Sequence, residues 1–362
     1  MTTSVSEIEG EQIEDAAERE DEEGPALPIA YAISSYGADY PVDSLVRRIR
    51  QGDIFIPAFQ RHFVWKLPQA SRFIESLLLG LPVPGLFLSR EDETNKLLVI
   101  DGQQRLETLR RYYDGEFAGR PFRLVNVQHP FEGKGYADLV EEDRRKLDDS
   151  IIHLTVVKQE SPADDKSSIY HIFERLNTGG TPLTPQQIRN ALFHQRPLTG
   201  FLERMNGLPE WRSLIGSVSP PAKDLELILR FLALYLYHDR YAPPMKGFLN
   251  FVMQEKANAS GPDLEIYQGV FSRAVQLAQK CLGNRPFRPS GPFNAAVYDA
   301  VMVGLARRIE TKKTSPDCAE IAKRYNSLIA NGYFQSAYRA STSSADSVRA
   351  RVELATEAFA GA

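Results

Sequence analysis

Ile100-Asp101-Gly102-Gln103-Gln104-Arg105-Leu106 is the stretch that decides the fold of the N-terminal half of this chain. It follows the apolar run Leu97–Ile100, and helical spacing begins within it, with Leu106, Leu109 and Tyr113 on one side. An apolar run, an Asp-Gly pair and helical spacing together predict a strand, a tight turn and a helix. The first N–H groups of such a helix make an anion site.

Two side chains of this stretch suggest chemistry. Arg105 falls on the first turn of the predicted helix, where a guanidinium can bind a phosphate through two bonds. Asp101, at the end of the strand, can hold a metal ion or orient a water molecule. An Asp-Gly turn followed by a surface arginine explains the same residues without any function, and the stretch alone leaves both interpretations open.

Composition is that of an ordinary soluble globular protein, with 43% hydrophobic and 25% charged residues. The 362 residues suffice for one large domain or two ordinary ones. Cys281 and Cys318 fit neither a disulfide framework nor a metal cluster, which favours a reducing compartment and a cytoplasmic protein. No apolar segment reaches the roughly 18 residues of a membrane span, and the acidic N-terminus is unlike a signal peptide.

Charge is distributed unevenly. The formal net charge is −4, but residues 1–30 hold ten acidic residues and one basic residue, so the rest of the chain carries +5. A like-charged segment poor in aromatic residues predicts a disordered tail over residues 1–28. Between Arg285 and Arg351 there are eleven basic and five acidic residues, including Arg307-Arg308 and Lys312-Lys313. This excess predicts contact with nucleic acid, for which the tail would compete, although solvated helix faces look the same.

The order of elements predicts an α+β domain followed by an all-α region. Helices are expected over residues 43–50, from about 70 to 78 before Gly80, and over 162–176. Strands are expected over residues 84–89, 96–100, 122–127 and 151–157.

A second loop, Asn177–Pro182, contains the pair Gly179-Gly180 and leads to Thr184, which heads a capping box with Gln187. Adjacent glycines let the backbone approach a ligand closely. The ending of one helix and the start of the next explain the same residues without function. That explanation does not account for Asn177 and Arg189, and we expect these two residues to face the same cavity as Arg105.

A third segment, Gln60–Trp65, mixes polar and aromatic residues. Phe63 and Trp65 are expected to pack in the core. Gln60 and Arg61 form a polar pair within an apolar run, and such a pair needs partners if it is buried.

These segments, taken in order, resemble the N-terminal domain of GmrSD-type (type IV, modification-dependent) restriction endonucleases, which belongs to the ParB/sulfiredoxin-like fold group. The resemblance spans residues 40–195 and rests on Ile56-Pro57-x-Phe59-Gln60-Arg61-x-Phe63-Val64-Trp65, Phe73-Ile74-Glu75-Ser76-Leu77-x-x-Gly80-x-Pro82-x-Pro84, Asp101–Arg105, and Phe173-x-Arg175-Leu176-Asn177-Thr178-Gly179-Gly180-x-x-Leu183. The segments Phe293–Ala300 and Ser347–Arg351 also resemble the helical tail of standalone members. The expected domains are therefore a disordered acidic tail over 1–28, a ParB/sulfiredoxin-like α+β domain over 29–195, and a helical domain over 196–362.

The resemblance implies binding and hydrolysis of a nucleoside triphosphate that regulates restriction of modified or phage DNA. It assigns catalysis to Asp101, Gln103 and Gln104, and a Mg²⁺ ion to Asp101. Nucleotide binding is expected of a wider set: Gly102, Arg105, Gln60, Arg61, Asn177, Gly179, Gly180 and Arg189. The nucleotide itself cannot be read from the sequence.

Two motifs are missing from the sequence. The six histidines all precede Tyr241, so the C-terminal third holds no His-Asn-His nuclease motif, and no Walker A pattern occurs. The expected protein is thus the nucleotide-handling component of an anti-phage or restriction system, with DNA and a nuclease protein as its expected partners. Two other functions stay open: a DNA-binding module without catalysis, and a metal-dependent nuclease that acts from the ParB-like site.

Overall fold

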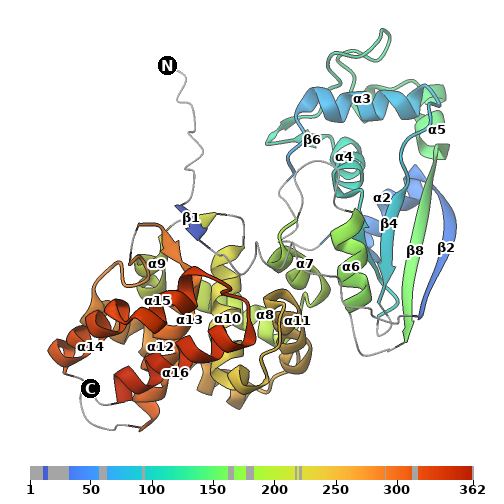
Figure 1. Ribbon diagram of the computed structural model, residues 1–362. Helices are drawn as coiled ribbons and strands as arrows, with labels where there is room; N and C mark the ends of the chain where they lie inside the picture. Colours follow the sequence, from blue (N-terminus) through green and yellow to red (C-terminus); the bar gives the residue numbers. More distant parts are fainter. Residues whose placement is uncertain are drawn as a thin grey trace, which may run out of the picture. The chain divides into compact units, whose positions relative to one another are not determined.

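The computed structural model describes residues 11–14, 32–56, 63–91, 94–161, 167–176, 183–216, 218–219, 222–289, 291–311 and 317–360 (Figure 1). The chain forms two compact units: Ile29–Leu183, and Thr184–Ala362 together with the N-terminal segment. The first unit is α+β and the second is helical apart from short strands, which confirms the predicted α+β domain followed by a helical region. The division follows Leu183, whereas the sequence placed it after Gln195, because helix α7 (Pro185–Leu192) packs against helices of the second unit.

A five-stranded mixed sheet organises the α+β unit. Its strands are β2 (Ala32–Pro41), β3 (Ile54–Phe55), β4 (Leu86–Arg90), β5 (Leu97–Asp101) and β8 (Ile151–Ser161), in the order β2-β8-β4-β5-β3. β4 is antiparallel to β5 and parallel to β8, while β2 is antiparallel to β8 and β3 is parallel to β5. The predicted strands at 84–89, 96–100 and 151–157 are therefore present.

Four helices cover one face of this sheet: α2 (Val42–Gln51), α3 (Leu67–Leu78), α4 (Gln103–Asp114) and α5 (Glu141–Asp149). Their apolar side chains form one core with alternate residues of the central strands, such as Leu88, Val99 and Val156. Helix α6 (Ser167–Leu176) contacts β5 and β8, and buries Ile169 and Phe173. Successive side chains of a strand point to opposite faces of the sheet, so only alternate residues of each strand enter the core beneath the four helices.

Two details of this unit differ from the sequence predictions. Residues 122–127 form no strand; only β6 (Glu116–Phe117) and β7 (Arg120–Pro121) pair there, and the short helix η1 (Tyr136–Asp138) follows. The alternation that suggested a strand reflects the burial of Phe122 and Leu124 in an irregular segment. On α4, Tyr112 joins Leu106 and Leu109 in the core, whereas the predicted Tyr113 is only partly buried.

The second unit is built from helices α7 to α16. After α7 these are α8 (Pro197–Asn206), α9 (Pro209–Ile215), α10 (Lys223–Tyr237), the short η2 (His238–Arg240), α11 (Met245–Lys256), α12 (Gly261–Leu282), α13 (Ala295–Thr311), α14 (Cys318–Ala330), α15 (Gly332–Arg339) and α16 (Ala345–Ala360). α13 is buried along nearly its whole length and packs against α10, α12 and α16. A Cβ added to Gly304 would lie 2.8 Å from the carbonyl oxygen of Ala355, so glycine permits this close approach of α13 and α16.

The acidic N-terminal segment contributes a strand to this unit. β1 (Glu11–Glu14) pairs in parallel with β10 (Phe293–Asn294) and with β9 (Val218–Ser219). The prediction that residues 1–28 are disordered throughout is therefore wrong at these four residues, and the others lie outside the described residues. The strand escaped the sequence analysis because its pairing partners lie some two hundred residues or more away in the chain.

A buried ion network joins three helices of the second unit. Arg230 on α10 donates through Nε and Nη2 to the two carboxylate oxygens of Asp299 on α13, at 3.1 and 2.7 Å. Arg351 on α16 donates to Oδ2 of Asp299 at 3.2 Å and to the carbonyl oxygen of Thr342. All three charged side chains are at most 1% exposed. Asp299 and Arg351, which lie in separate motifs of the sequence, thus meet in the core.

The two cysteines are bonded to each other, which corrects the prediction from their number. Cys281 at the end of α12 and Cys318 at the start of α14 form a disulfide, with their Cα atoms 4.6 Å apart. Their separation of 37 residues gave no sign of pairing; the packing of α12 against α14 brings them together. The cysteines therefore give no support for a reducing compartment.

Membrane crossing requires a helix that is both long and apolar. Across the part of the chain that the structure describes, none of the helices has this combination.

We expect Asp299→Asn to lower the free energy of unfolding by about 3–5 kcal/mol, since removing the carboxylate leaves two buried guanidiniums without their shared counter-charge. Urea unfolding followed by circular dichroism measures the change. Glu353→Gln on the exposed side of α16 is the control and should stay within about 0.5 kcal/mol of wild type. A similar small effect for both variants would contradict the role given to Asp299.

Reduction of the Cys281–Cys318 disulfide should destabilise the helical unit. A crosslink over this loop length stabilises by about 3–4 kcal/mol through the entropy of the unfolded chain. Thermal unfolding with and without dithiothreitol should therefore show a lower melting temperature in the reduced protein. Cys318→Ser should melt at the lower temperature under both conditions, and a reductant-induced shift that persists in this variant would rule out the disulfide as its cause.

Candidate functional site

The predicted strand–turn–helix is present at the end of β5. The strand ends at Asp101, and Gly102 precedes α4 with φ 97° and ψ 11°. A Cβ built on Gly102 would lie 2.2 Å from Cδ2 of Leu86. Only glycine combines this left-handed backbone with such close packing. The turn leaves the N-terminus of α4 at the end of the sheet, an arrangement typical of anion-binding sites.

Arg105 has a structural role that the sequence did not predict. Its Nη1 donates to the carbonyl oxygens of Pro84 and Gly85 at 2.5 and 2.6 Å, and its Nη2 donates to Oδ2 of Asp101 at 2.8 Å. The side chain is 13% exposed. The guanidinium therefore fastens the segment before β4 to the turn between β5 and α4.

The other residues of the motif divide into exposed and structural positions. Asp101 has a side chain that is 39% exposed, although Oδ2 is paired with Arg105. Gln104 accepts through Oε1 from the backbone N–H groups of Val64 and Trp65, at 2.9 and 3.2 Å. This places Phe63 and Trp65 against the core, as predicted. Gln103 is partly buried on the first turn of α4.

The same end of the sheet carries a pair of titratable side chains that the sequence analysis missed. His153 on β8 lies opposite Asp39 on β2, and its Nδ1 is 2.8 Å from Oδ1 of Asp39. The imidazole lies beside two glycines: a Cβ on Gly37 would be 2.9 Å from its Cε1, and one on Gly85 would be 3.7 Å from its Cδ2. A carboxylate on Nδ1 holds the ring and directs Nε2 away from Asp39. No local motif marks this pair, because Asp39 and His153 meet only through strand pairing.

Several predicted site residues cannot be placed near Asp101. Gln60, Arg61, Asn177, Gly179 and Gly180 lie outside the described residues.

Arg189 belongs to the second unit, on α7. There its side chain is 1% exposed and donates to Glu226 at 2.6 Å and to Gln186 at 2.7 Å. The predicted capping box at the start of this helix, between Thr184 and Gln187, is confirmed.

The donor set limits how a metal ion can bind. Among the described residues, no group of three or more His, Cys, Asp or Glu side chains could hold a metal ion. Asp101 by itself fits Mg²⁺ only when phosphate oxygens and water supply the other ligands, which is how this ion is usually held beside nucleotides.

The basic region between Arg285 and Arg351 is only partly on the surface. Arg308 and Arg351 are buried, at 3% and 0% exposure, and Arg307 pairs with Glu310 and donates to the carbonyl oxygen of Tyr235. The predicted basic face therefore does not include Arg308 or Arg351, because the fold uses arginines in its interior. Lys312 and Lys313 lie outside the described residues, and DNA contact by this region stays a prediction.

Comparison with known proteins agrees with the geometry of the α+β unit. Residues 42–194 match a restriction-enzyme family, described as GmrSD restriction endonuclease, N-terminal domain. Residues 42–194, less than half of the chain, therefore match the family predicted from the sequence, and the match points to a restriction system that acts on DNA. It extends past the division at Leu183 to include α7. No curated protein matches the chain.

We expect Arg105→Ala to lower the free energy of unfolding by about 1–3 kcal/mol, since two backbone carbonyls lose their donor and Asp101 loses its partner. Urea unfolding of the full chain measures this. The matched control is Arg72→Ala, an exposed arginine on α3, which should change the value by less than about 0.5 kcal/mol. Equal stability of the two variants would contradict the fastening role of Arg105.

Proposed function

We propose that this protein is a nucleotide-dependent regulatory component of a restriction system directed against phage or modified DNA, and that its α+β unit binds and hydrolyses a nucleoside triphosphate. The observation that carries the proposal is the turn from Asp101 through Gly102 into α4, in a domain that matches the GmrSD family. A helix N-terminus next to a partly exposed carboxylate suits a phosphate chain with its Mg²⁺ ion.

The proposed roles follow from the contacts. The backbone at the start of α4 binds phosphate oxygens, and Gly102 gives the turn its shape. Arg105 keeps the turn in place, and those of its N–H groups that do not donate to Pro84, Gly85 or Asp101 are available to a phosphate. Asp101 would hold the metal ion through Oδ1, because its Oδ2 is paired with Arg105. Gln103 lies on the first turn, where a side-chain amide can orient the attacking water.

Cutting of DNA belongs to a different protein in this proposal. The chain has no histidine after His238 and so no His-Asn-His motif in its C-terminal third. We therefore propose a nuclease partner, whose action on DNA is controlled by the nucleotide state of this protein. Restriction of incoming DNA takes place where that DNA is found, so we place the protein in the cytoplasm.

Asp101→Asn should separate binding from hydrolysis. An amide retains the hydrogen bond from Arg105 but is a weaker Mg²⁺ ligand, so we expect nucleotide affinity to fall less than fivefold and turnover to fall at least tenfold. Phosphate release by malachite green, with Mg²⁺ and each of the four triphosphates, measures turnover in the presence and absence of DNA. Asp149→Asn, an exposed carboxylate at the end of α5, is the control and should behave as wild type.

Two outcomes would contradict the proposal. Wild type that neither binds nor hydrolyses any triphosphate, yet binds duplex DNA, would favour the DNA-binding module without catalysis. Wild type that nicks plasmid DNA in Mg²⁺ or Mn²⁺ without a partner would favour a nuclease acting from this domain. The triphosphate, DNA-binding and plasmid-nicking assays, all run on one preparation of the full chain, distinguish the three functions.

A further inference from the structure

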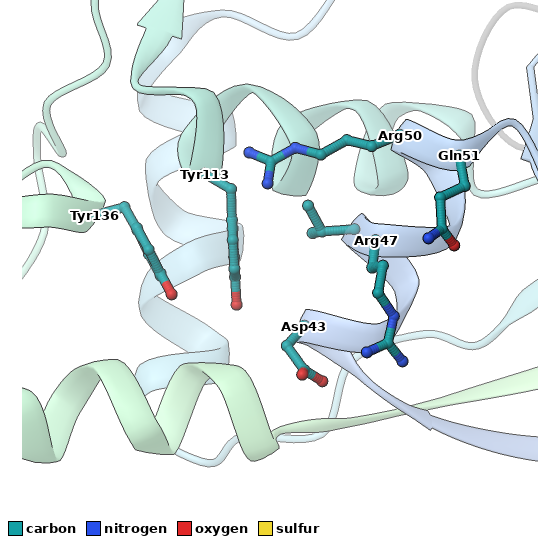
Figure 2. A pocket seen from close by; sticks show the side chains of 7 residues that line it. Asp43, Arg47, Arg50, Gln51, Tyr113 and Tyr136 are labelled. Carbon is teal, nitrogen blue, oxygen red and sulfur yellow. The ribbon is translucent and has the colours of Figure 1, made fainter.

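The α+β unit contains a cavity at the C-terminal end of α4, away from the turn at Gly102. It has a volume of about 540 Å³ and lies between α2, α4 and η1 (Figure 2). Its lining consists of Asp43, Val46, Arg47, Arg50, Gln51, Tyr113 and Tyr136. Gln103 and Tyr113 are ten residues apart on α4, so at 1.5 Å per residue the cavity lies roughly 15 Å along the helix from its N-terminus.

One wall of the cavity is an ordered pair of aromatic rings. Tyr113 and Tyr136 are stacked, with ring centroids 4.1 Å apart and planes inclined by 24°. Both hydroxyl groups donate to Oδ1 of Asp148, at 2.6 and 2.9 Å. Burial and the bond to Asp148 raise the pKa of both phenols, that of Tyr136 to about 12. The two rings are therefore held in one orientation by neutral, hydrogen-bonded phenols.

The opposite wall comes from α2. In Figure 2 Tyr113 stands between Tyr136 and the side chains of α2, so the face of Tyr113 that is not stacked is directed toward that helix. Val46 is buried at 1% exposure and gives an apolar floor. Arg47 and Arg50, one turn apart, bring two guanidiniums to the rim, with Asp43 and Gln51 beside them.

The two arginines differ in their partners. Arg50 pairs with Asp114 on α4, through both Nε and Nη2. Arg47 is exposed and donates to the hydroxyl of Ser44 at 3.2 Å. Among the residues that the structure describes, no carboxylate lies within 4 Å of the Arg47 guanidinium. This charge is available for an anion.

We propose that this cavity binds one nucleotide unit, with its base stacked on the open face of Tyr113 and its phosphate paired with Arg47. Aromatic stacking suits every base, because each presents a π-face. A guanidinium binds phosphate through a planar pair of donors. The cavity volume lies in the range of pockets that hold a single small ligand. Asp43 can accept a hydrogen bond from the edge of the base, and Gln51 can donate or accept one.

This site is separate from the proposed triphosphate site at Gly102, and neither depends on the other. The nucleotide unit can come from a free mononucleotide or from a single strand of DNA, which present the same base and phosphate. The two sources differ in measurement, since a strand offers several units and a higher local charge, and its binding weakens more steeply with salt.

The test uses two fluorescent probes with the full-length protein. Etheno-AMP represents the free nucleotide, and a fluorescein-labelled heptamer of single-stranded DNA represents the strand; anisotropy titrations give the dissociation constants. Arg47→Gln should weaken binding of at least one probe by fivefold or more, since the phosphate partner is lost. Arg72→Gln, an exposed arginine on α3, is the matched control and should leave binding unchanged.

Tyrosine variants test the stacking wall. Tyr113→Phe keeps the ring and should retain the affinity within twofold, whereas Tyr113→Leu should weaken binding about tenfold, provided that circular dichroism shows an intact fold. Weakening by Arg47→Gln but not by Arg72→Gln supports the site. Failure of wild type to bind either probe at up to 1 mM protein, or equal binding by wild type and Arg47→Gln, overturns it.

Discussion

The guanidinium of Arg105 is the contact on which the α+β unit depends. It joins the segment before β4 to the turn between β5 and α4, which lies about 20 residues further along the chain. Two of its bonds go to the backbone carbonyls of Pro84 and Gly85, directly before β4. Gly102 then has to adopt a left-handed backbone against Leu86, since a side chain there would collide with the core. The proposed phosphate site is the N-terminus of α4, which this turn places at the end of the sheet.

A comparable principle holds in the helical unit, where charge rather than backbone geometry sets the packing. Asp299 accepts from Arg230 and Arg351, so three helices are linked through one buried carboxylate. Burial lowers the pKa of the Arg351 guanidinium, and Asp299 opposes that effect. Taking such charges out of water costs free energy that only close pairing offsets. Because pairing mainly offsets the cost of burial, the ion network specifies the packing arrangement of α10, α13 and α16 and adds little net stability.

The two proposed nucleotide sites lie at opposite ends of α4 and use different chemistry. At the N-terminal end, backbone dipoles and one carboxylate favour a phosphate chain with its metal ion. At the C-terminal end, a stacked tyrosine pair and Arg47 favour a base with its phosphate. The two sites share no residues, so a substitution at one end of α4 can be tested without removing contacts at the other end.

The sequence by itself determined the order of elements and the family of the domain. Periodicity marked α3, β5 and α4; local chemistry marked the capping box at Thr184; and the motifs from Ile56 to Leu183 marked the GmrSD resemblance. Each of these signals is contained in a short stretch of sequence, so it can be read without the fold.

Only the tertiary structure decided which partner each polar group has. It assigned Arg105 to the carbonyls of Pro84 and Gly85, paired His153 with Asp39, joined Cys281 to Cys318, and turned Tyr113 toward a cavity while Tyr112 entered the core. It also placed Arg308 and Arg351 in the interior, where the count of charges had suggested a basic surface. The physical reason is that each of these outcomes depends on atoms brought together by strand pairing and helix packing, and a linear pattern carries no record of them.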